Sequence, residues 1–156
     1  YMPGGSPSII FPEISSRPEN YNNLSESERV YQEAVAYLVS SGFTEVVRFY
    51  RQKTKIMNFI KLLPEENTSN YAVTKGIGFI TGLFVKNTME LYADFFSASN
   101  SVRAAILYHE YIHCIKTKGK LYIEAEMIAT EEEMKVWGQL GVFESDASYI
   151  ADTYAF

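Results

Sequence analysis

The chain has 156 residues, of which 47% are hydrophobic and 15% aromatic, and its formal net charge is -5. This length is enough for one domain with a real core, and the apolar content excludes a disordered chain. The negative charge, without any run of Lys and Arg, argues against a nucleic-acid partner. No apolar run approaches the roughly 18 residues of a membrane span, so we expect none.

The compartment and the oligomeric state stay open at this level. Cys114 is the single cysteine, which excludes an intrachain disulfide but says little about the redox environment. No signal peptide is visible, and the chain starts at Tyr1 rather than Met, so a removed upstream segment stays open as well.

The first segment, residues 1–24, is predicted to be an extended arm, because it holds four of the five prolines among Ser, Gly and Asn. Residues 25–156 are predicted to form one domain. Ser25 and Glu28 make a capping box that begins a helix, and Gly42 ends it. A second helix is expected from about Thr44 to Lys53, then an extended piece to Leu63 and a loop over 64–70.

The segment from Gly76 to Asp94 is predicted to be β structure. One apolar run covers 79–85, Lys86-Asn87 can turn the chain, and Thr88–Tyr92 form the return run. Because this return run lies just before the next helix, we expect it to be the sheet edge beside a cleft, where an extended peptide could add as a strand.

Two helices follow. The first is expected to be capped by Asn100 or Ser101 and to reach about Lys116, and its apolar residues on several sides indicate burial between the sheet and a second helical layer. The second is expected from about Tyr122 to Leu140, with Gly141 as its stop and residues 131–133, three glutamates, as its solvated face. The tail after it shows no clear period.

The motif that carries chemistry lies in the first of these two helices. His109-Glu110-Tyr111-Ile112-His113 reads H-E-x-x-H and uses both histidines of the chain. On a helix, positions i and i+4 share a face, so the two imidazoles can bind one Zn²⁺. Glu110 projects along a neighbouring line of the helix, where it can hold a metal-bound water without binding the metal.

A catalytic zinc site needs a third protein ligand. With no third histidine, that ligand is a carboxylate or Cys114, and Cys114 points about 100° away from His113 around the helix. The downstream carboxylates are Glu124, Glu126, the 131–133 run and Glu144. Glu124 and Glu126 begin a helix that can fold back antiparallel to face His113.

The H-E-x-x-H motif, a turn and a helix with Glu126 together resemble the gluzincins, the zincin metallopeptidases with a glutamate ligand. The resemblance covers about residues 76–140 and implies an α+β, zincin-like fold, in which a small sheet with a β-hairpin packs against the motif helix. It favours Glu126 over Glu124 as the third ligand, because Ala129 supplies the small residue three positions later. Thr130 stands where several gluzincins have an acid that hydrogen-bonds to a histidine, so the chain departs from the gluzincin pattern at this position.

This resemblance implies a zinc-dependent metallopeptidase that hydrolyses a peptide or protein with a zinc-bound water and Glu110 as the general base. A tyrosine would stabilise the oxyanion, and the candidates near in sequence are Tyr92, Tyr108, Tyr111 and Tyr122. The alternative is a non-catalytic binding or structural module with a zincin fold. The intact Glu110 argues against it, because a purely structural site would not need that carboxylate.

Overall fold

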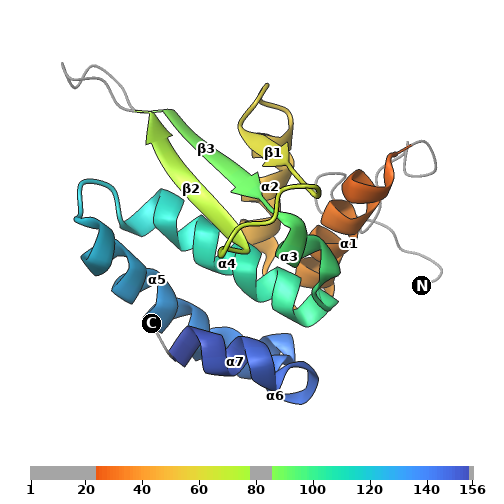
Figure 1. The fold of residues 1–156 in the computed structure, drawn as a ribbon, viewed down its shortest axis with the longest axis vertical. Coiled ribbons are helices and arrows are strands. Elements are labelled where there is room, and N and C mark those ends of the chain that lie inside the picture. The colour runs from red at the N-terminus through yellow and green to blue at the C-terminus, as the bar shows by residue number, and fades with distance from the viewer. Residues whose placement is uncertain (1–23, 78–85, 155–156) are drawn as a thin grey trace.

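The computed structural model describes residues 24–77 and 86–154, and this part is α+β, as predicted (Figure 1). Two helices come first, then three strands, then five helices, of which α4 carries the H-E-x-x-H motif. In chain order the elements are α1 (Glu26–Ser40), α2 (Thr44–Thr54), β1 (Ile60–Leu62), β2 (Ala72–Ile77), β3 (Lys86–Leu91), α3 (Ala93–Ser97), α4 (Asn100–Lys116), α5 (Tyr122–Leu140), α6 (Val142–Ser145) and α7 (Ala147–Tyr154). The arm predicted over 1–24 lies outside the described residues except for Leu24.

Local sequence signals account for the first two helices. The Ser25 hydroxyl accepts from the Glu28 backbone N–H at 3.3 Å, and the Ser25 N–H donates to the Glu28 carboxylate at 2.9 Å, which confirms the capping box. Gly42 follows α1 with φ +90, a conformation that suits glycine. The predicted helix from Thr44 is confirmed as α2. The extended piece predicted after it is confirmed only as β1, because residues 55–59 form turns.

The sheet differs from the prediction in two ways. Its order is β1-β3-β2, with β1 parallel and β2 antiparallel to β3, so the return run is the central strand and β2 is an edge. Lys86 and Asn87 are not a turn, because they pair with Ile77 and Gly76 inside the β2–β3 ladder. The run predicted over 79–85 lies outside the described residues.

The physical reason for the central position of β3 is burial. Met89 and Leu91 are fully buried, as expected of a strand that has neighbours on both sides. Its neighbour β1 is far from the motif helix in sequence. The prediction that β3 is the sheet edge rested on its nearness in sequence to the motif helix. That nearness gives no information about β1, which comes earlier in the chain and pairs with the other side of β3.

The motif helix α4 is buried on most sides, as predicted. It packs against β2 on one side, α5 on another and α1 behind, so it lies between the sheet and the C-terminal helices (Figure 1). Its N-cap is Ser99, whose hydroxyl accepts from the Val102 N–H at 3.4 Å. The predicted caps Asn100 and Ser101 are instead its first helical residues.

The chain reverses after α4 and runs back along it as α5. Gly119 in this turn has φ +79, and Gly141 with the same φ ends α5 as predicted. The tail without a clear period forms α6 and α7, and buried Tyr149 anchors α7. Among the described residues, every helix is too short or too polar to cross a membrane.

A stability test follows from the packing of α1 on α4. Leu38 is fully buried in α1, so Leu38→Ala should lower the free energy of unfolding by about 2–5 kcal/mol. Leu121 is 79% exposed, so the same change there should stay within about 0.5 kcal/mol. Urea unfolding of both variants measures the difference, and equal losses would contradict this packing.

Candidate metal centre

Two helices bring three possible metal ligands together. His109 and His113 project from α4, one turn apart, and Glu126 projects from the first part of α5. Glu126 Oε1 lies 2.9 Å from His109 Nε2 and 3.0 Å from His113 Nε2. One ligand atom from each of the three residues lies within 4.8 Å of the others, a grouping that could hold a metal ion.

Outer partners orient both histidine rings. His109 Nδ1 lies 3.0 Å from Glu133 Oε1, so its Nδ1–H donates to that carboxylate. The Thr117 hydroxyl donates to the His113 carbonyl at 2.9 Å. Because that hydroxyl's hydrogen is used in this way, the Thr117 Oγ1 atom accepts from His113 Nδ1–H at 3.3 Å. With both Nδ1 atoms used in this way, each ring turns Nε2 toward Glu126. This is how outer hydrogen bonds set the tautomer of a metal-ligating histidine.

Glu133 corrects the prediction of a solvated acidic face on α5. Its side chain is 1% exposed, and its Oε2 accepts from Trp137 Nε1 at 2.7 Å and from the Tyr149 hydroxyl at 2.6 Å. Its neighbour Glu131 is exposed, and Glu132 forms surface ion pairs with lysines, so the prediction is right for the run's other members. Glu133 is instead a buried acceptor for three donors.

A sequence signal for Glu133 existed in the helical period. The buried residues of α5 are Ala125, Ala129, Glu133, Trp137 and Leu140, which is the spacing of one helix face. Glu133 lies seven residues after Glu126, two turns along that face. The expected acid after Glu126 is absent at position 130, but the hydrogen bond to a histidine that it would make is present from Glu133.

The charges of this cluster shift the pKa values of its members. Burial by itself lowers the pKa of His109, but the hydrogen bonds to Glu126 and Glu133 and the nearby Glu110 charge outweigh it and raise the pKa from 6.5 to about 10. Burial raises the pKa of Glu126, and the hydrogen bonds to both histidines outweigh that and lower it to about 2. At neutral pH, the site therefore holds a protonated His109 against an ionised Glu126, so a metal must displace that proton to bind.

Glu110 lies beside this cluster without taking part in it. It is 5% exposed, and its Oε1 accepts from the Thr74 hydroxyl of β2 at 2.6 Å. Thr74 was not among the residues singled out in the sequence, because no local pattern relates β2 to a helix about 35 residues later. The contact arises because α4 packs on β2.

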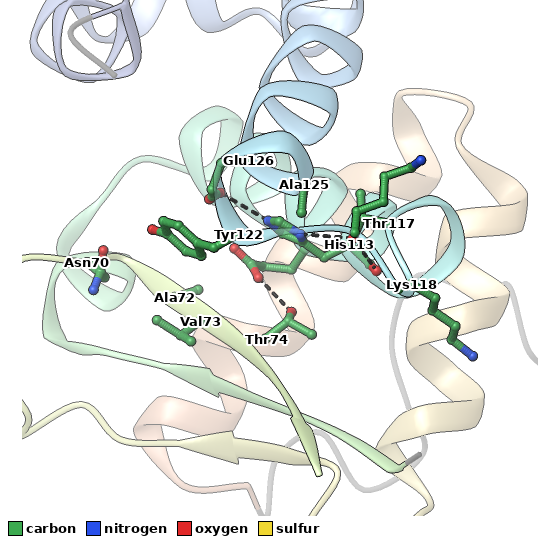
Figure 2. Close-up of a pocket in the computed structure, with 13 residues that line it drawn as sticks. Asn70, Ala72, Val73, Thr74, His113, Thr117, Lys118, Tyr122, Ala125 and Glu126 are labelled. Carbon is green, nitrogen blue, oxygen red and sulfur yellow. Dashed lines mark hydrogen bonds and ion pairs between the residues drawn. The ribbon is translucent and has the colours of Figure 1, made fainter. Parts of the chain in front are cut away.

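A cleft of about 540 Å³ opens in front of these groups (Figure 2). The edge strand β2, the turn after α4 and the start of α5 form its walls, and Glu110, His113 and Glu126 line it. A second hollow of about 240 Å³ continues past His109 toward α7 and shares Asn70, Ala72, Glu110 and Glu126 with the first. Glu110 therefore lines both cavities.

The remaining sequence candidates lie elsewhere. Glu124 is 58% exposed and faces Lys120 at 3.9 Å, and Cys114 is buried in the core cluster. The rings of Tyr108 and Tyr111 pack against Phe43 and Phe49, away from the cleft.

Two other tyrosine candidates remain. The Tyr92 hydroxyl donates to Glu90, whereas Tyr122 lines the larger cavity. Tyr122 is therefore the one of the four predicted tyrosines that the cleft exposes.

The last of the downstream carboxylates is Glu144, and its side chain lies outside what the structure describes.

Comparison of the chain with protein-family models, curated protein sequences and solved structures finds no match. The site's own geometry is therefore the basis for a functional proposal.

The role of Glu133 can be tested against its neighbour in the same acidic run. Glu133→Ala leaves the Trp137 N–H and the Tyr149 hydroxyl buried without their acceptor. Each buried donor without a partner costs about 1–3 kcal/mol of stability. We expect a loss of at least about 2 kcal/mol in the free energy of unfolding. Glu131→Ala, at an exposed position, should stay within about 0.5 kcal/mol. Urea unfolding measures both, and similar values would show that Glu133 is not the buried acceptor described here.

Proposed function

We propose that this protein is a zinc-dependent metallopeptidase, with His109, His113 and Glu126 as the metal ligands and Glu110 as the general base. One observation carries the proposal. Both histidine Nε2 atoms meet the Glu126 carboxylate at 2.9–3.0 Å, and the Glu110 carboxylate lies beside them in the wall of the same cleft.

The donor set fits zinc. Two imidazole nitrogens and one carboxylate are a ligand set of catalytic zinc sites, which keep one further position open. The hydrogen bonds of His109 to Glu133 and of His113 to Thr117 supply the outer partners that such ligands have. Zn²⁺ held there would polarise the carbonyl of a peptide bond and make a water acidic enough to give up a proton near neutral pH.

The chain's own residues supply the remaining chemistry. Glu110 can take the proton of the attacking water and deliver it to the leaving amine. Ala72, Val73 and Thr74 of β2 line the cleft, so this edge strand offers backbone groups to an extended peptide. Because Glu110 lines both hollows, each of them offers room for part of a chain next to the bond that is cut.

The proposal includes a zincin-like fold of the glutamate-liganded type. The support is the order of the parts: an edge strand, a motif helix, a turn and an antiparallel helix that carries Glu126. The chain departs from the gluzincin pattern in its acidic partner for a histidine, which is Glu133 rather than a residue at 130. Glu133 lies two helical turns after Glu126, whereas position 130 lies one turn after it. Both positions are on α5, so the acidic partner still comes from the helix that carries Glu126.

The alternative class is a non-catalytic module that binds metal or a partner through this fold. The placement of Glu110 favours an enzyme, since a structural site has no use for a carboxylate beside the ligands and in the wall of a cleft. The two classes differ in one measurable respect, which is whether Glu110 affects hydrolysis or only stability.

Zinc binding tests the ligand set. The wild-type protein should bind one Zn²⁺ per chain, and His113→Ala or Glu126→Ala should weaken binding by more than the roughly 10–100-fold that loss of an outer partner costs. Glu124→Ala is the matched control, because Glu124 is exposed and faces Lys120, and it should keep full affinity. Elemental analysis and competition with a chromophoric chelator measure both. Stoichiometric zinc in the His113 variant would exclude this site.

Catalysis tests the role of Glu110. Glu110→Gln keeps the size of the side chain and should leave zinc content and folding nearly intact, yet it should reduce peptide hydrolysis by roughly 10²-fold or more because the proton acceptor is lost. Cleavage of a peptide library, with zinc added and with a chelator, provides the measurement. Cleavage that persists in the chelated protein, or equally in the Gln variant, would falsify this mechanism. Zinc binding without any cleavage would favour the binding module.

A further inference from the structure

We infer that Thr74 is a positioning residue for Glu110, in that its hydroxyl holds one carboxylate oxygen and directs the other toward the reacting water. The inference rests on the proposed function. It assigns a role to β2 beyond forming the cleft wall, because the strand that would hold the substrate would also hold the base.

The contact joins two elements that are far apart in the chain. Thr74 lies in the middle of the edge strand β2, opposite Met89 of β3, and points across the cleft wall toward α4 (Figure 2). Its Oγ1 donates to Glu110 Oε1 at 2.6 Å. Both residues line the larger cavity together with His113 and Glu126, so the hydrogen bond lies at the reaction site.

The bond has the properties of an anchor. A hydroxyl that donates to a carboxylate at 2.5–2.7 Å is in the short range of charge-assisted hydrogen bonds. A free glutamate side chain samples several rotamers, and fixing it costs conformational entropy that this bond offsets before substrate arrives. Among the described residues, no other hydrogen bond to the Glu110 side chain is seen, so the second oxygen stays available for a proton.

Positioning matters because a general base must lie within hydrogen-bonding reach of the proton that it removes, and small displacements lower the rate strongly. The metal ligands do not fix Glu110, since they are held by Glu133, Thr117 and each other. A hydroxyl at position 74 is therefore the group that sets the carboxylate's orientation. Substrate that pairs with β2 would be placed relative to the same strand.

The competing explanation is that Thr74 only satisfies a buried carboxylate. That role would affect stability and zinc affinity along with the rate. Positioning would affect kcat, with KM and zinc affinity unchanged, and would move the Glu110 carboxylate itself. The two explanations therefore differ in readouts that do not depend on one another.

The experiment compares three variants of the full chain. Thr74→Val removes the hydroxyl at nearly constant shape, Thr74→Ser keeps it, and Thr88→Val makes the same change at a buried position of β3. For zinc-loaded protein, kcat and KM on a cleaved library peptide, zinc affinity, the thermal unfolding midpoint and crystal structures would be measured. The crystal structures read the Glu110 position without any need for activity.

We expect Thr74→Val to lower kcat by about 10- to 100-fold, as for a misplaced catalytic group, with KM and zinc affinity within about twofold. Thr74→Ser and Thr88→Val should stay close to wild type. The Glu110 carboxylate should leave its position in the Val variant and keep it in the Ser variant.

Two kinds of result overturn the inference. One is a Val variant with wild-type kcat and an unmoved Glu110. The other is a Val variant that unfolds or loses zinc, which assigns Thr74 the structural role. If the wild-type protein cleaves no peptide, the proposed function fails separately, and the crystal structures still decide whether Thr74 sets the position of Glu110.

Discussion

The buried carboxylate of Glu133 is the constraint on which the site and the C-terminal half of the fold both depend. A carboxylate that is 1% exposed costs several kcal/mol unless donors surround it. Here the donors come from His109 of α4, Trp137 of α5 and Tyr149 of α7. Helices α4 and α7 must therefore dock on α5 together, and the orientation of His109 is obtained as part of the same packing.

The same principle repeats at the other members of the site on a smaller scale. Thr117 holds the ring of His113, and Thr74 holds the carboxylate of Glu110. Each of these groups thus has a partner that belongs to another element or to the next turn of chain. A small domain can in this way present a preorganised cluster without a large surrounding scaffold, because these partner residues remove the rotamer freedom of the side chains that line the site.

The chemistry of the site separates into two layers with different requirements. His109 and Glu126 form an ion pair beside His113, in which His109 has a raised pKa and Glu126 a lowered one, since each stabilises the charged form of the other. Glu110 lies outside that ion-pair cluster and faces the cleft. This division, with a cluster of possible metal ligands and a separate carboxylate that lines the cleft, is the observation that supports the proposed hydrolytic function.

Sequence by itself determined the parts of this protein that depend on local geometry. The i, i+4 spacing placed His109 and His113 on one face of a helix, and the capping signals at Ser25 and Gly141 set helix ends that the structure confirms. The shared face of the two histidines and the helix ends follow from the helical period and from backbone preferences, which act over a few residues. The choice of Glu126 over Glu124 rested instead on the resemblance, and although the structure turns Glu126 toward both histidines, its role as a ligand stays a prediction.

Only the tertiary structure decided the rest. Glu133 belongs to an acidic run that is otherwise solvated. It is buried among hydrogen-bond donors that include His109, 24 positions earlier, and Tyr149, 16 positions later. Thr74 meets Glu110 across 36 positions, and β1 takes the far side of β3 to make β2 the edge. Such contacts are chosen by the packing of the whole core, where burial and the satisfaction of polar groups are settled together, and no short window of sequence contains both partners.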